Sequence, residues 1–145
     1  MKKSTKIILR IVVIPIAAIF LFFIISEITS VRVNTSFADS VFIEIEDGNL
    51  LSFSVEVESD DTNELKEIFN GKRAWPDSPS CPTGGVNIIF KSERKELILH
   101  PAGDGCSTVM VGEYPSDKYF HLSENENERV QEILSKYGVA YPFGI

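Results

Sequence analysis

The chain has 145 residues and a net charge of −7, from 14 lysines and arginines against 21 aspartates and glutamates. Residues 1–30 carry four basic side chains and one acidic, net +3, which leaves ten basic and twenty acidic, net −10, for residues 31–145. A domain with that charge repels phosphate backbones and anionic lipid headgroups, which argues against nucleic acid as a partner. The 115 residues after Ser30 (145 − 30) suit one domain with one core.

The N-terminal segment joins positive charge to an apolar run. Four positive charges come first, at Lys2, Lys3, Lys6 and Arg10. Fifteen uncharged, mostly apolar residues follow over 11–25. This order predicts insertion into a bilayer, with the N-terminus in the cytoplasm and the chain beyond about residue 30 outside.

Two interpretations of this segment remain open. An uncleaved single-pass anchor would lie in the membrane over residues 7–28, because a spanning helix needs about 20 apolar residues. A cleaved signal peptide needs a small-x-small site after the apolar run, and 28–30 and 36–38 match that pattern poorly. Secretion after cleavage is the alternative to a tethered protein. The expected division is a signal-anchor or transmembrane segment 1–30, a linker 31–40 and an extracytoplasmic domain 41–145. The alternative for residues 31–40 is that their valine and phenylalanine residues pair as an edge of the sheet.

The domain begins with a predicted β-hairpin. Apolar and polar residues alternate over 41–46 and again over 51–58, and this period of two is typical of half-buried strands. We expect a three-residue turn at 47–49, with Ile45 opposite Leu51. The outward glutamates form a solvated face, or alternatively a surface for calcium or a basic partner: Glu44, Glu46, Glu56 and Glu58.

A helix follows the hairpin. Asp60 or Asp61 is the predicted first residue of the helix; with Asp61 as the N-cap, Glu64 falls at position N3 as in a capping box, and Gly71 ends the helix. The spacing of its apolar residues gives a stripe for the core: Leu65, Ile68 and Phe69.

Residues 72–85 predict a long loop. Three prolines and two terminal glycines disfavour a helix or a central strand there. Long loops in compact domains are usually either functional or disordered, and the cysteine within this loop argues against disorder.

The second half predicts four more strands and a helix. Side chains over residues 86–91 alternate between the two faces of a predicted strand, and Leu97 and Leu99 belong to the strand that pairs with it. If Phe90 pairs with Leu97, Lys91 lies opposite Glu96 as a pair of opposite charges. Residues 108–111 and 118–122 are the next two strands, and Ser123 caps the last helix, with Glu126 at N3 and Gly138 at its end. The order β-β-α-β-β-β-β-α favours an α+β fold: an antiparallel sheet of about six strands with two helices packed on one face, preceded by the N-terminal membrane helix.

The two cysteines, Cys81 and Cys106, both lie in the part expected outside the cytoplasm, where a pair most often forms a disulfide. A zinc site made with His100 and His121 is the competing interpretation, but the spacings match no zinc motif. No Cys-x-x-Cys, P-loop or dinucleotide fingerprint is present, so we expect neither a metal nor a cofactor.

The candidate binding site is the loop that this disulfide would hold beside residues 101–106. A fastened loop loses less entropy on binding. It displays Arg73 and Trp75, residue types enriched at interface hot spots, with Asp77 and Asp104 flanking them. The alternative for Trp75 is that it covers the edge of the core.

Several short motifs resemble uncharacterised small domains of exported or membrane-anchored bacterial proteins. The similar residues lie in the C-terminal half: Asp104-Gly105-Cys106, the Lys118-Tyr119-Phe120 strand before a Ser-capped acidic helix, and Lys136-Tyr137-Gly138 with Pro142-Phe143. The resemblance implies a bacterial host and a domain of unknown function, and it carries over no catalytic residue.

These observations leave three classes of function. The first is a membrane-tethered extracytoplasmic module that binds a protein or a small ligand. The second is a secreted inhibitor or immunity-type protein. The third is a hydrolase, for which Ser107, His100 and Asp104 would supply a triad, but no Gly-x-Ser-x-Gly elbow supports it and we do not expect an enzyme.

Overall fold

The computed structural model describes residues 13–47, 51–113 and 116–140. The chain divides into two compact units, Met1–Ser30 and Val31–Ile145. In the first unit, helix α2 spans Ile14–Thr29. Among the residues described, we find no helix that is both long enough and apolar enough to cross a membrane. Residues 7–12 of the expected span lie outside the described residues.

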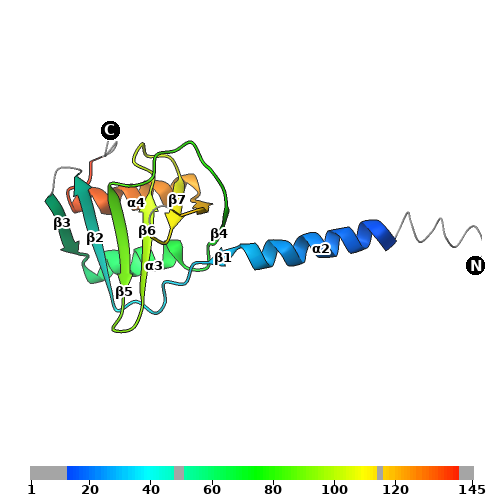
Figure 1. Cartoon of the computed structure of the whole chain (residues 1–145). Coiled ribbons are helices and arrows are strands. Elements are labelled where there is room, and N and C mark those ends of the chain that lie inside the picture. The colour runs from blue at the N-terminus through cyan, green and yellow to red at the C-terminus, as the bar shows by residue number, and fades with distance from the viewer. Residues whose placement is uncertain (1–12, 48–50, 114–115, 141–145) are drawn as a thin grey trace, which may run out of the picture. The chain divides into compact units, whose positions relative to one another are not determined.

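The second unit is built on one eight-stranded antiparallel sheet in the order β1-β4-β8-β7-β6-β5-β2-β3 (Figure 1). The strands are β1 (Val31–Arg32), β2 (Ser40–Asp47), β3 (Leu51–Glu56), β4 (Arg73–Pro76), β5 (Val86–Lys91), β6 (Glu96–Pro101), β7 (Thr108–Val111) and β8 (Lys118–His121). Helices α3 (Ser59–Phe69) and α4 (Glu124–Lys136) lie together on one side of the sheet (Figure 1). The predicted α+β class with an antiparallel sheet is confirmed.

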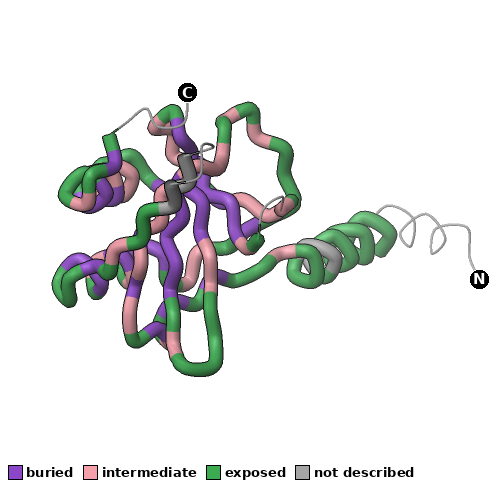
Figure 2. The backbone as a smooth tube through the Cα atoms, turned by 60° about the vertical axis from the view of Figure 1, so that its left-hand side comes forward, coloured by how far each residue is buried: buried purple, intermediate pink, exposed green. Residues whose placement is uncertain are grey.

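The main core fills the space between the sheet and the two helices, where Figure 2 shows the buried residues gathered along the strands. Its centre is Phe69, the last residue of α3, which is completely buried. The Phe69 ring meets Phe90 and Phe120 edge to face, at centroid distances of 5.9 and 6.1 Å. Such aromatic pairs add to the stability that burial of their apolar surface already provides.

The two strands beyond the expected six are β1 and β4. They pair with each other, and β4 also pairs with β8 through Trp75 opposite Tyr119. Part of the predicted loop 72–85 is therefore a strand. Pro76 is compatible with it because it is the last residue of β4, where a missing backbone donor does least harm to the ladder.

The expected linker 31–40 is packed against the domain, which corrects that prediction. Val33 is 1% exposed, and its backbone N–H donates to the Lys72 carbonyl at 2.8 Å. The Thr35 hydroxyl donates to the Lys66 carbonyl at 2.8 Å, and the Lys66 amine donates to the Ala38 carbonyl at 2.8 Å. These two hydrogen bonds with Lys66 and the burial of Val33 hold the segment against the domain.

The first hairpin has a different register from the expected one. Ile45 lies opposite Phe53, and Asp47 lies opposite Leu51. The difference is two residues, so every side chain stays on the face that the alternation predicts. The turn residues 48–50 lie outside the described part of the chain. In the next hairpin both predicted pairs are confirmed: Phe90 with Leu97 and Lys91 with Glu96, whose charged atoms lie 3.7 Å apart.

The predicted helix ends are partly confirmed. Ser123 and Glu126 form a complete capping box at the start of α4, and Gly138 follows that helix with φ +86°. Gly71 follows α3 with φ +80°, as expected for a glycine that ends a helix. The N-cap of α3 is wrong: the helix starts at Ser59 after Glu58, and Asp61 lies inside the first turn.

Candidate functional site

The face of the sheet opposite the helices carries a row of large side chains. The residues lie opposite one another on neighbouring strands, in the order Trp75, Tyr119, Met110 and His100. Met110 is completely buried and His100 is 5% exposed, although both helices lie on the other side of the sheet. Another part of the chain therefore covers this end of the row.

Residues 77–85 provide that cover. This segment arches from β4 to the start of β5 (Figure 1). The Thr83 hydroxyl lies 3.7 Å from the Met110 sulfur, and Thr83 forms an antiparallel bridge with Ala102. The segment thus shields Met110, while Trp75 and Tyr119 at the other end of the row stay partly exposed.

Arg73 and Trp75 form an exposed pair on β4. Ala74 between them is completely buried in the main core, so its two neighbours point to the opposite side of the sheet. The Arg73 guanidinium carbon lies 6.0 Å from the centre of the Trp75 ring, within the range of a cation–π contact. Trp75 is 37% exposed, and it does not belong to the main core cluster. We call Arg73, Trp75 and Tyr119 the β4–β8 patch.

The two predicted aspartates lie in different surroundings. Asp77 follows Trp75 by two residues; its backbone N–H donates to the Asp117 carbonyl at 3.0 Å, and its carboxylate accepts from the Ser78 N–H at 2.7 Å. Asp104 lies in the loop that contains the disulfide-bonded Cys106, and its carboxylate accepts a hydrogen bond from the Cys106 N–H at 3.1 Å. The structure brings Arg73 and Trp75 together, with Asp77 beside them in the chain, and fixes Asp104 in the disulfide loop.

The predicted disulfide between Cys81 and Cys106 is present, with Cα atoms 6.6 Å apart. It joins the 77–85 segment to the loop after β6, and a backbone hydrogen bond of 2.8 Å from Gly103 to Pro82 strengthens the junction. The Gly105 carbonyl accepts from the Asn127 and Gln131 side chains of α4, at 2.9 and 3.0 Å. The disulfide therefore attaches the 77–85 segment, through this loop, to α4.

The disulfide sulfurs and the Asp104 carboxylate lie within 4.8 Å of one another. Thiolates are the sulfur ligands that metals prefer, and bonded sulfurs are not thiolates. The cluster therefore offers a metal ion one carboxylate. Of the two histidines considered for zinc, His121 lies nearby, since its Nδ1 is 3.2 Å from the Thr108 hydroxyl, which is 3.6 Å from the Cys81 sulfur. His100 instead contacts the Gly112 carbonyl through Nε2 at 2.8 Å.

Three ion pairs that the sequence does not predict connect α4 to the rest of the domain. Lys136 donates to the Asp61 carboxylate at 2.6 Å, Arg129 to Glu64 at 2.7 Å, and Lys72 to Glu126 at 2.6 Å. Tyr137 adds a hydrogen bond from its hydroxyl to Asp61 at 2.9 Å and accepts one from the Glu58 N–H. A signal for one of them exists in the sequence, because Asp61 falls on the apolar stripe of α3, four residues before Leu65.

These contacts shift the acid–base behaviour of the partners. The hydrogen bond from Lys136, supported by one from Tyr137, lowers the pKa of Asp61 although burial opposes the shift. The same contact with Asp61 raises the pKa of Lys136. Burial raises the pKa of Tyr137. For Glu126, burial acts to raise the pKa, but hydrogen bonds from Lys72 and Ser123 outweigh it and the pKa is lowered.

The lowered pKa of Asp61 predicts acid sensitivity. Its ionised form stabilises the fold above the unfolded-state pKa, near 3.8, and that contribution is lost as the pH falls through the lower folded-state pKa. We expect Asp61→Asn to lower the free energy of unfolding by about 2 kcal/mol at pH 7 and by less at pH 3, where part of the contribution of the ionised carboxylate is already lost. Urea denaturation at both pH values measures this, with the exposed neighbour changed in Asp60→Asn as the control. An equal loss at both pH values would contradict the assigned role.

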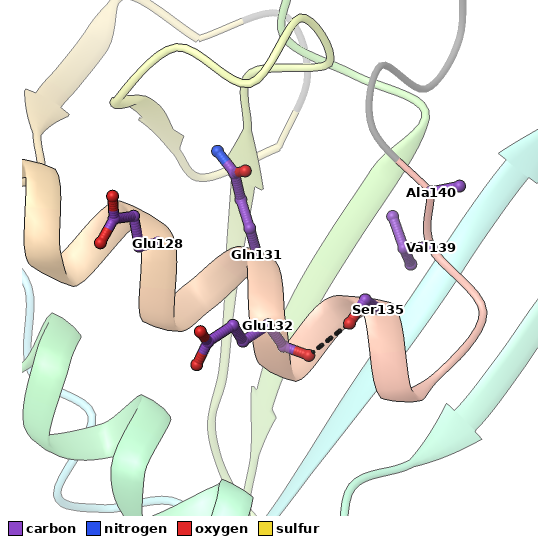
Figure 3. A pocket seen from close by; sticks show the side chains of 6 residues that line it. All are labelled: Glu128, Gln131, Glu132, Ser135, Val139 and Ala140. Carbon is purple, nitrogen blue, oxygen red and sulfur yellow. Dashed lines mark hydrogen bonds between the residues drawn. The ribbon is translucent and has the colours of Figure 1, made fainter.

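A shallow hollow of about 390 Å³ lies on the outer side of α4 (Figure 3). Its lining residues are Glu128, Gln131, Glu132, Ser135, Val139 and Ala140. The Ser135 hydroxyl donates to the Glu132 carbonyl at 2.7 Å, and the Gln131 amide holds the Gly105 carbonyl. The Gln131 amide nitrogen and the Ser135 hydroxyl are therefore engaged within the domain, and the lining residues of the hollow include two carboxylates but no basic side chain.

Comparisons with protein-family models, with curated proteins and with solved structures gave no significant match for this chain. The β4–β8 patch is therefore the candidate site on its geometry alone.

Proposed function

We propose that the protein is a membrane-tethered binding module that works outside the cytoplasm and contacts its partner through the β4–β8 patch. The observation that carries this proposal is the exposed Arg73–Trp75 pair, set on a strand of the sheet and away from the core. Arginine, tryptophan and tyrosine are the residue types most enriched at interface hot spots. A strand holds such side chains more rigidly than a free loop does, so binding costs less conformational entropy.

The tether and the compartment rest on the sequence. Basic residues precede the apolar run, as in segments whose N-terminus stays in the cytoplasm. The disulfide supports an oxidising surrounding, because such bonds are rare in the cytosol. A secreted inhibitor or immunity-type protein would use the same disulfide-fastened segment, and it differs from the tethered module only in losing residues 1–30.

Two substitutions test the patch. We expect Trp75→Ala and Arg73→Gln each to weaken capture of the partner about tenfold or more, because hot-spot side chains contribute most of the binding free energy. The melting temperature should stay within a few degrees, since neither side chain belongs to the main core cluster. The measurement is crosslinking of the full chain in its native membrane, with each crosslinked product quantified against the wild type.

The matched control is Arg94→Gln, which removes an exposed arginine from the turn between β5 and β6. It should leave crosslinking unchanged. Unchanged crosslinking in the Trp75 and Arg73 variants would remove the patch from consideration. N-terminal sequencing of the same material separates the tethered module, which keeps its N-terminus, from the secreted form. Substrate turnover that is lost in His100→Ala would instead favour a hydrolase.

A further inference from the structure

The two edges of the sheet differ in how they are protected. One edge is β1, which has only two residues and is too short to template another strand. The other edge is β3, which has six residues. Natural edge strands usually carry charged side chains, a proline or a bulge that blocks further pairing. The β3 sequence Leu-Ser-Phe-Ser-Val-Glu has no lysine or proline, and its one charged residue is Glu56 at the end of the strand. Among the described strands, β3 pairs with β2 alone (Figure 1).

The backbone of β3 has hydrogen-bonding groups directed outward. The Val57 N–H donates to the Val41 carbonyl at 2.9 Å just beyond the strand. In an antiparallel ladder, residues alternate between facing the partner strand and facing away from it. Counting back from Val57, Val55 and Phe53 face β2, while Glu56 and Ser54 direct their N–H and carbonyl groups away from it. These outward groups are what an added strand would bind.

The side chains of β3 indicate what kind of strand would fit. On the helix side, the Phe53 side chain is 54% exposed, more than Trp75 of the β4–β8 patch at 37%. On the other side, Glu56 is exposed, and Glu44 of β2 lies opposite Ser54. An added strand would place alternate side chains beside these two surfaces. The first surface favours apolar residues and the second favours basic ones.

We propose that β3 accepts an extended segment of a partner protein as an additional strand, and that this segment alternates apolar residues with lysine or arginine. The charge of the domain supports a basic occupant, because a net charge of −10 over residues 31–145 attracts a basic segment from a distance. A second copy of the chain fits less well, since two bodies of that charge repel each other and would bring their β3 glutamates to one edge. This interface lies at the opposite edge of the sheet from the β4–β8 patch and is independent of it.

A labelled peptide tests the proposal. A peptide of about eight residues that alternates valine and lysine should bind the full chain in detergent micelles, and its fluorescence anisotropy should rise on titration. A peptide of the same composition with all valines before all lysines should bind at least about tenfold more weakly, because only the alternating peptide matches both faces of the strand. Equal binding of the two peptides would show simple charge attraction and overturn the proposal.

The backbone contacts are tested in the protein and in the peptide. Ser54→Pro removes one outward N–H and leaves the groups that face β2, so it should weaken binding at least about tenfold, while Ser54→Ala should not. Circular dichroism confirms that the proline variant is folded. Methylating alternate backbone nitrogens along one edge of the peptide makes the same test without altering the protein. The proposal would be overturned if methylation along either edge of the peptide left its affinity at the unmethylated value. A dimer of the chain that excludes the peptide would also overturn it.

Discussion

Replacing Phe69 with alanine is expected to lower the free energy of unfolding by about 3–5 kcal/mol. The substitution removes a completely buried ring that contacts Phe90 of β5 and Phe120 of β8, so the cavity lies where α3 meets the sheet. The surrounding side chains belong to different elements and cannot all move inward to fill it. Denaturation with urea, followed by circular dichroism, measures the loss.

The control is the same substitution at an exposed phenylalanine. Phe53→Ala on β3 should cost much less, because the Phe53 side chain is already 54% exposed and leaves no closed cavity. Comparable losses in the two variants would mean that the Phe69 cluster is not the centre of the core.

Much of the sheet was predictable from the sequence because its strands are regular. The alternation over Val86–Lys91 and the opposite charges of Lys91 and Glu96 determine both the face and the register of β5 against β6. The first hairpin shows the limit of this argument. Alternation determines the face of each side chain but leaves the register uncertain by multiples of two residues, and the observed register differs by two.

Strands β1 and β4 were not predictable because they are short. Arg73–Pro76 has too few residues to show a period, and its proline disfavours a strand in isolation. It forms a strand because β8 on one side and β1 on the other complete its hydrogen bonds. The buried Val33 then holds the preceding segment in place. Strands β1 and β4 therefore form because of their pairing in the folded sheet and not because of local strand propensity.

At the start of α3, Asp61 could serve either as the N-cap of the helix or as a buried partner of Lys136. Ser59, Asp60 and Asp61 are all good N-caps, so sequence alone cannot tell which one begins the helix. The helix begins early enough to carry Asp61 onto its buried side, where Lys136 and Tyr137 hold the carboxylate. A partner 75 residues away in the chain is visible only in the folded structure.

Two residues of the β4–β8 patch, Arg73 and Trp75, could be named from the sequence, whereas Tyr119 could not, because it joins them only through the pairing of β4 with β8. Arg73 and Trp75 share a face because they are two residues apart on a strand, which follows once β4 is known. The sequence places Asp104 with them because the predicted disulfide joins the loop 72–85 to residues 101–106. Its carboxylate instead caps the Cys106 backbone, a local contact that a loop sequence does not specify.

Removing the disulfide is the second change with a large expected effect. Replacing Cys81 and Cys106 together with alanine should lower the free energy of unfolding by roughly 3 kcal/mol, because the bond closes a loop between residues 25 apart in the chain. Besides this loss of overall stability, the 77–85 segment itself should become less firmly held. Without the bond, the 77–85 segment is held over Met110 chiefly by the Thr83 bridge to Ala102 and the hydrogen bond from Gly103 to Pro82.

Hydrogen exchange separates the two effects. Amides of the 77–85 segment should exchange faster in the double variant even under conditions where the folded state is fully populated, while amides of β5 and β6 keep their protection. Reducing the wild-type protein with a phosphine should reproduce both changes and should have no effect on the double variant, which serves as the control. If reduction destabilised both proteins equally, or if the segment kept its protection, the bond would not be what fastens it. Since the 77–85 segment begins two residues after Trp75, the same loosening should weaken partner capture by the β4–β8 patch.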